Sequence, residues 1–161
     1  MRPRTALFAS VVLLALVMVI ILTVQQSPPG GGADPKYSLR EPLPGNVANI
    51  ERPGQTLNYR GLAVPGKTTV VEFYSPYNEA CTSLEPKILA LASRRADLVV
   101  RKLNVNRPGV PGTDLDSPLS IQYHLNTLPE FKVMDGQGRL KAEGPAARKL
   151  VADYLVATLG R

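Results

Sequence analysis

The chain has 161 residues, enough for one ordinary domain and an additional segment. Its net charge is +6, but Lys and Arg are scattered along the chain, which argues against a nucleic-acid-binding surface and suits a solvated surface near anionic lipid. The single cysteine, Cys81, excludes an intramolecular disulfide and a cysteine-rich metal site. His124 is the lone histidine and is interpreted as a surface residue. We therefore expect no metal ion and no cofactor.

The first predicted element is a transmembrane helix. Residues 6–24 read ALFASVVLLALVMVIILTV, and as a helix this run is about 28 Å long, close to the bilayer core of about 30 Å. Arg2 and Arg4 precede it, which favours a cytoplasmic N-terminus over residues 1–5. We expect a single-pass signal anchor in the cell membrane, with the rest of the chain extracytoplasmic, and periplasmic if the source is a bacterium with two membranes.

The alternative for this segment is a cleaved signal peptide. Such peptides have a shorter apolar region, about 7–15 residues, that ends in an A-x-A-like site, and no such site follows residues 6–24. Both interpretations export the remainder. Residues 25–54 are rich in Pro, Gly, Asn and Ser, and they are predicted to form a flexible tether between the membrane and a domain at 55–161.

Residues 55–161 show the patterns of an alternating α/β domain. β-branched and aromatic residues predict strands, whereas apolar residues at helical spacing predict helices. The predicted elements are an edge strand at 56–64, a strand at 67–74, a helix at 79–95, a strand at 98–105, a short helix at 118–124, strands at 131–134 and 139–143, and a final helix after Gly144-Pro145. The strand–helix–strand unit predicts a parallel pair, and the turn residues 135–138 predict a hairpin.

Four pieces of this sequence, in order, resemble the thioredoxin superfamily, and in particular a membrane-anchored bacterial thioredoxin-like protein with a degenerate Cys-x-x-Cys motif. Residues 71–77 look like the strand that enters the thioredoxin active site, and Asn78-Glu79-Ala80-Cys81 takes the place of the motif. Pro86 matches the proline in the helix that follows, and residues 122–129 resemble the segment that ends in the family's cis-proline. The resemblance implies a three-layer α/β/α sandwich with a mixed central sheet, preceded here by one transmembrane helix.

The resemblance also implies what is missing. In the family, the first cysteine of the motif attacks a substrate disulfide as a thiolate and the second resolves the mixed disulfide. In this chain Asn78 stands at the attacking position and Cys81 at the resolving one, so one chain has no dithiol cycle. Asn78 is a favourable N-cap and can serve that role alone. Cys81 has two interpretations, an inert, partly buried thiol and a reactive thiol near a helix start.

Two further site residues follow from the resemblance. Glu72 aligns with a buried acid that moves the proton of the resolving cysteine; a hydrogen-bonded glutamate at a strand end is the alternative. Thr127-Leu128-Pro129 looks like the cis-proline loop, whose backbone pairs with an extended peptide. We expect the Leu128–Pro129 bond to be cis and Tyr77 and Asn78 to line the same docking surface.

Three functions remain open at this point. The first is a non-catalytic module that binds an extended peptide or partner protein at the Pro129 loop. The second is a monothiol redox protein that acts through Cys81 in thiol–disulfide exchange. The third is a membrane-tethered part of a larger complex, held through residues 6–24. We favour the first, and do not expect dithiol oxidoreductase activity, because the missing residue is the one that starts the chemistry. Partner identity and oligomeric state are not encoded in these patterns.

Overall fold

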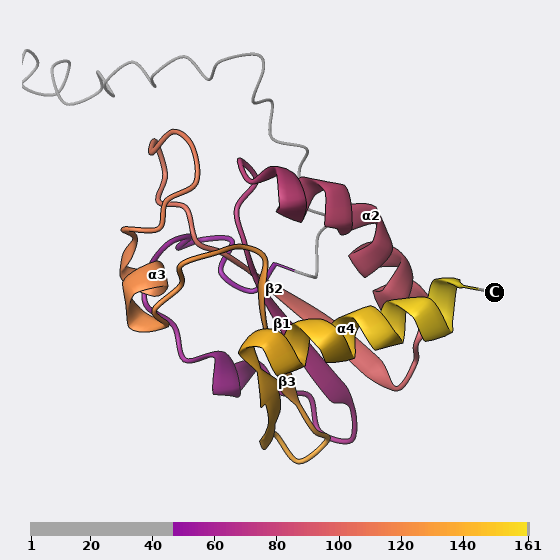
Figure 1. Cartoon of the computed structure of the whole chain (residues 1–161). Coiled ribbons are helices and arrows are strands. Elements are labelled where there is room, and N and C mark those ends of the chain that lie inside the picture. The colour runs from indigo at the N-terminus through magenta and orange to yellow at the C-terminus, as the bar shows by residue number, and fades with distance from the viewer. Residues whose placement is uncertain (1–46, 161) are drawn as a thin grey trace, which may run out of the picture. The chain divides into compact units, whose positions relative to one another are not determined.

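Strand β1 (Thr68–Tyr74) lies inside a mixed four-stranded sheet in the computed structural model, which describes residues 47–160 (Figure 1). The other strands are β2 (Leu98–Asn104), β3 (Glu130–Met134) and β4 (Leu140–Glu143), and the order is β2-β1-β3-β4. β1 pairs parallel with β2 and antiparallel with β3, which pairs antiparallel with β4. This confirms the predicted parallel strand pair and the predicted hairpin.

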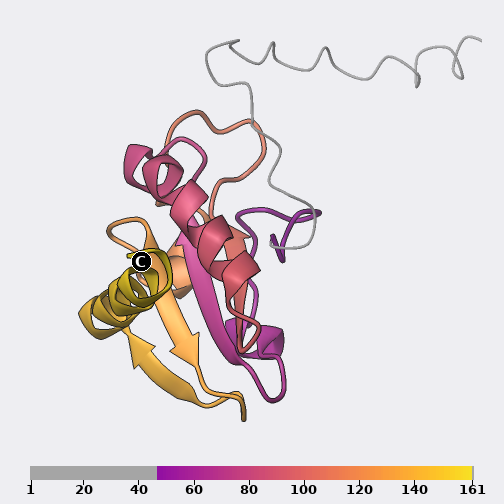
Figure 2. The same cartoon turned by 90° about the vertical axis from the view of Figure 1, so that its right-hand side faces the viewer.

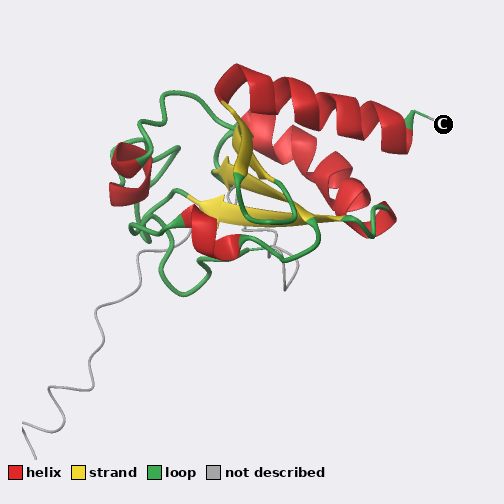
Figure 3. Ribbon diagram, turned by 90° about the horizontal axis from the view of Figure 1, so that it is seen from below, coloured by secondary structure: helices red, strands yellow, loops and turns green. Residues whose placement is uncertain are grey.

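Helices α2 (Glu79–Arg94) and α4 (Gly144–Leu159) lie side by side on one face of the sheet (Figures 2 and 3). Their buried residues form a core with the sheet residues of that face: Val70, Ile88, Leu91, Leu98, Val100, Phe131, Val133, Ala147 and Val151. α2 continues through Pro86, as the resemblance implied. The predicted helices at 79–95 and after residue 144 are therefore confirmed.

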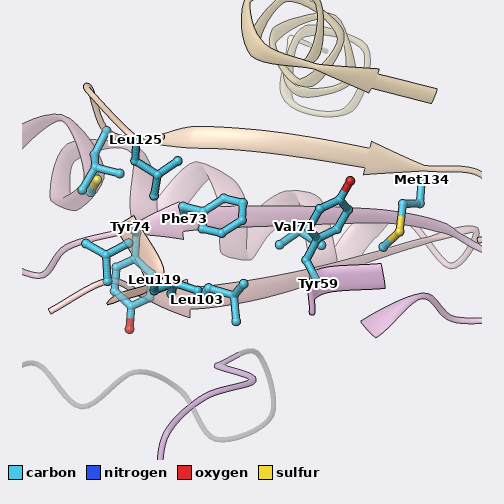
Figure 4. Close-up of a cluster of buried hydrophobic side chains, with 11 residues drawn as sticks. Tyr59, Val71, Phe73, Tyr74, Leu103, Leu119, Leu125 and Met134 are labelled. Carbon is cyan, nitrogen blue, oxygen red and sulfur yellow. The ribbon is translucent and has the colours of Figure 1, made fainter. Parts of the chain in front are cut away.

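The opposite face of the sheet is covered by a 3₁₀ helix, η2 (Tyr59–Leu62), and a short helix, α3 (Pro118–Gln122). Side chains from both pack around Phe73, which lies among Val71, Leu103 and Leu119 in this second core (Figure 4). Helical segments thus cover both faces, and the domain has the thioredoxin-like α/β fold with a mixed sheet.

The predicted edge strand at 56–64 is wrong. Residues 59–62 form η2 instead, because the side chain of Asn58 accepts a hydrogen bond from the Arg60 amide (3.1 Å) and so caps a helical turn. The ring of Tyr59 is buried edge-to-face against Tyr123, with centroids 5.4 Å apart. This segment therefore contributes one buried tyrosine to the core and does not form a pleated strand.

Residues 47–54, assigned to the tether from composition, contact the domain. The Ala48 amide donates to the Lys102 carbonyl (2.8 Å), and Asn49 exchanges two hydrogen bonds with the backbone of Asn104 (2.8 and 2.9 Å). Gly54 has a positive φ of 73°, and a Cβ there would lie 2.8 Å from the Arg107 backbone nitrogen, so only glycine fits. Val47 also forms a parallel bridge with Lys102, so residues 47–54 pack on the domain.

Within residues 47–160, no helix has the length and apolar character needed to cross a membrane. The predicted span at 6–24, the cytoplasmic residues 1–5 and most of the predicted tether lie outside the described residues.

Candidate functional site

The ends of three strands meet at one edge of the sheet. Tyr74, the last residue of β1, pairs with Asn104, the last residue of β2, and Phe73 pairs with Glu130, the first residue of β3. The β1–α2 turn at 75–78, the loop after β2 and the Pro129 loop therefore leave the sheet at the same edge. Figure 1 shows the first two at the same end of the domain. The fold brings the predicted motif and the predicted docking loop together.

Asn78 is the N-cap of α2. It has extended backbone angles, and its Oδ1 accepts a hydrogen bond from the Cys81 amide (3.1 Å). The turn before it is closed by Ser75, whose carbonyl accepts from the Asn78 amide (3.2 Å) and whose Oγ accepts from the Tyr77 amide (3.1 Å). The asparagine at the attacking position thus satisfies one of the free amides of the helix start.

Cys81 lies in the first turn of α2, with 2% of its surface exposed. Burial raises the pKa of the Cys81 thiol to about 11. A backbone hydrogen bond from Ser75 lowers this pKa, the nearby Glu72 carboxylate raises it further, and the positive charge of Lys102 lowers it. The thiol is therefore buried and protonated at neutral pH, in contrast to the exposed thiolate that attacks disulfides.

Glu72 lies on β1 and is fully buried. Neither of its carboxylate oxygens has a hydrogen-bond partner within the described part of the chain. Burial raises the pKa of Glu72 to about 7, against the opposing charge of Lys102, whose Nζ lies 3.9 Å from Oε2. The carboxyl group is thus poised to be partly protonated at neutral pH beside the buried thiol.

Lys102 completes this cluster, and it had no place in the sequence argument. It is 1% exposed on β2, directly opposite Glu72, and its Nζ donates to Glu85, one helical turn after Cys81. The same Nζ lies 4.1 Å from the centre of the Tyr74 ring. Burial lowers the pKa of Lys102, and the nearby Glu72 and Cys81 oppose this only in part. The signal that could have found it is a lysine within a buried strand, Leu98-Val99-Val100-Arg101-Lys102-Leu103.

The Pro129 loop has the predicted backbone. The Leu128–Pro129 bond is cis, Leu128 is buried and Thr127 is exposed. The loop leads directly into β3, so its backbone lies at the sheet edge described above. The predicted cis bond is therefore confirmed, whereas peptide docking at Thr127, Leu128 and Pro129 stays a prediction.

No group of three or more His, Cys, Asp and Glu side chains within residues 47–160 is arranged to hold a metal ion. His124 is exposed and follows α3 in a left-handed conformation, with φ of 52°.

The chain is similar to "Thioredoxin-like protein HCF164, chloroplastic" of Arabidopsis thaliana, with 30% identity over 100 residues that cover 62% of this chain and 36% of that protein. This chain thus spans about a third of the length of the curated relative it matches. Beside this similarity, the chain has a mixed sheet and a cis bond at Leu128–Pro129, directly before β3. The sequence similarity and the fold together support the thioredoxin superfamily for this chain.

Solved structures of thioredoxins are also similar to this chain. Thioredoxin f from spinach chloroplast (short form) is 18% identical with a TM-score of 0.46, over 70% of this chain and 94% of that one. Thioredoxin f2 of Chlamydomonas reinhardtii is 22% identical with a TM-score of 0.40, over 55% and 76%. No protein-family model matches the chain.

Proposed function

We propose that this chain is a membrane-anchored, extracytoplasmic thioredoxin-like protein that binds a partner and does not catalyse dithiol–disulfide exchange. One observation carries the proposal: the single thiol is buried and protonated, while the attacking position holds an N-cap asparagine.

Thiol–disulfide exchange begins with attack by a thiolate. With a pKa of about 11, Cys81 would be a thiolate in about one molecule in ten thousand at pH 7. With 2% of its surface exposed, its sulfur is also shielded from a disulfide on another protein. Both properties argue against the monothiol alternative as well as the dithiol one.

The binding half of the proposal rests on the sheet edge. Tyr77 and Asn78 are half-buried in the β1–α2 turn, and the cis-proline loop leaves the same edge. An extended peptide that lies along this loop would pair with its backbone as an added strand does. These groups need no thiol for binding.

Insulin reduction in the presence of dithiothreitol tests the catalytic half. The full chain is expected to give the background rate. Asn78→Cys is expected to gain at least weak activity, because a thiol there would lie at the α2 N-terminus one turn from Cys81. Asn78→Ser is the matched control, because serine also caps a helix but supplies no thiol.

Two outcomes would contradict the proposal in different ways. If the natural chain is active and Cys81→Ser abolishes the activity, the chain is a monothiol redox enzyme. If Asn78→Cys folds but forms no disulfide with Cys81 on oxidation, the alignment of the motif is wrong.

The membrane-anchoring part of the proposal rests on the apolar run at 6–24 and the preceding Arg2 and Arg4. A reporter active only outside the cytoplasm, such as alkaline phosphatase, is expected to work when fused after Arg161. A reporter that works only in the cytosol at that position would overturn the topology, and recovery of the chain in the soluble fraction would indicate cleavage.

A further inference from the structure

A groove of about 280 Å³ lies beside the Pro129 loop, on the face of the sheet that α2 and α4 cover. Its walls come from α2, α4, the loop and the start of β3. Six of the side chains that line it matter here: Leu84, Leu128, Phe131, Arg148, Val151 and Leu155. Five of these six are apolar.

The openness of the groove argues against a cofactor or other enclosed small molecule. Pockets for such ligands usually measure about 300–1,000 Å³ and enclose most of the ligand. The groove is at the lower limit of this range and open to solvent, which suits one large side chain of a longer ligand. Thr127, Leu128 and Pro129 belong both to its wall and to the proposed docking loop, so a peptide on that loop would pass its mouth.

The charged side chain in the groove lining is an arginine. Arg148 is the charged residue in the lining, and it pairs with Glu130. The two partners differ in exposure: 43% of the Arg148 side chain is accessible, against 14% of the Glu130 side chain. The guanidinium is therefore the charge that a ligand meets, and its remaining N–H groups can donate to a second carboxylate.

We propose that this groove binds a large apolar side chain, such as Leu or Phe, of an extended peptide segment that carries an Asp or Glu next to it. The peptide backbone lies along the Pro129 loop, the apolar side chain enters the groove, and the neighbouring carboxylate contacts Arg148. This inference rests on the proposed function, because it names the partner chemistry of the same docking surface.

The test uses the full chain in detergent and three fluorescein-labelled octapeptides on a Gly/Ser background. One carries Leu-Asp at its centre, one Ala-Asp and one Leu-Asn. Fluorescence anisotropy is expected to show the Leu-Asp peptide binding about tenfold or more tightly than Ala-Asp, since a buried leucine side chain accounts for at least that factor. The Leu-Asn peptide is expected to bind severalfold less tightly than Leu-Asp, and the difference should disappear in Arg148→Gln.

Groove-filling variants make the test specific. Ala152 lines the groove and is exposed, so Ala152→Phe is expected to fill it and remove the preference for Leu over Ala. Val156→Phe is the matched control, because Val156 is exposed on the same helix outside the groove lining. Methyl NMR shifts of Leu84 and Val151 on addition of the Leu-Asp peptide give a second measurement that needs no variant.

The outcomes separate this inference from the proposed function. If all three peptides bind equally well, and Ala152→Phe changes nothing, the groove is not the site and docking on the loop stands. If no peptide binds and no methyl signal shifts, the inference is overturned. Insulin reduction by the natural chain would overturn the non-catalytic function on separate grounds.

Discussion

Two neighbouring pairs of residues in the sheet lie in different environments, one apolar and one charged. Phe73 on β1 pairs with Leu103 on β2, and Glu72, one residue earlier, pairs with Lys102. All four are buried, at 0% or 1% exposure. The first pair lies in an apolar core, where the Phe73 ring is 5.0 Å from the ring of Tyr123. The second pair lies beneath α2, among Cys81 and Glu85.

The two pairs differ in how their contribution to stability depends on pH. The apolar pair removes hydrocarbon from water and is indifferent to pH. The charged pair is incompletely compensated, because Lys102 donates to Glu85 while both oxygens of Glu72 lack a hydrogen bond among the described residues. We infer that the sheet face that carries Phe73 contributes most to the free energy of unfolding. The charged pair on the face that α2 covers makes this free energy depend on pH.

The largest expected effect comes from truncating the apolar pair. Phe73→Ala would leave a cavity at the centre of the second core and lower the free energy of unfolding by about 3–5 kcal/mol. Urea denaturation followed by circular dichroism at pH 5.5 and pH 8 measures this. The loss is expected to be the same at both pH values, and a loss that changed with pH would contradict the assignment of this face.

The second effect is expected to be almost as large, but only at high pH. Lys102→Met removes the cation beside Glu72, and breaking a buried ion pair in this way is expected to cost about 3 kcal/mol at pH 8. At pH 5.5 most of the loss should disappear, because Glu72 is then protonated and needs no cation.

Lys132→Met is the matched control for this substitution. Lys132 pairs with Glu143, which is largely exposed and can be solvated without its partner. Lys132→Met is therefore expected to change the free energy of unfolding little at pH 5.5 or at pH 8. The double variant Glu72→Leu with Lys102→Met is expected to be near neutral. A strongly destabilised double variant would mean that the charged pair itself stabilises the fold.

Much of the fold could be predicted from the sequence, because strands and helices carry local patterns. The burial of β1, the N-cap at Asn78 and the cis bond at Pro129 were all predicted, the last through the family resemblance. The Glu72–Lys102–Glu85 cluster was not, because it depends on the register between β1 and β2 and on which face of α2 meets the sheet. The groove depends on three segments that are separated in the sequence: α2, residues 127–131 and α4. The strand predicted at 56–64 was wrong because the Asn58 side chain caps a helical turn there.

A third prediction concerns pH directly. The pKa of Glu72 rises from 4.5 in the unfolded chain to about 7 in the folded domain, so the folded state binds more protons between these values. Its contribution to stability is therefore greatest below pH 4.5 and is lost as the pH rises to about 7, a decrease of about 3 kcal/mol at most. Urea denaturation at intervals from pH 4.5 to 8 measures the slope.

Glu72→Gln is the control, since the amide has no proton to lose in this range, and its stability is expected to be flat with pH. Carboxyl groups of lowered pKa act in a more acidic range and leave this window unchanged: Asp97, Asp114, Asp135 and Glu143. A natural chain as flat as Glu72→Gln would show that the Glu72 carboxylate is compensated in the folded state.

The smallest expected effect is at the start of α2, where the helix that covers the charged pair begins. Asn78→Ala removes the acceptor of the Cys81 amide and is expected to lower the free energy of unfolding by about 1 kcal/mol, whereas Asn78→Asp keeps the cap and is expected to lose little.

The effect on the first turn of α2 is more informative than the effect on global stability, because Cys81 lies in the turn that the cap holds closed. A loss of about 1 kcal/mol confined to that turn would raise the population of its open form about fivefold. The rate of Cys81 alkylation by iodoacetamide under native conditions should rise by the same factor in Asn78→Ala. If alkylation of the natural chain already matches that of free cysteine, the thiol is accessible, and the burial of Cys81 no longer argues against a reactive thiol.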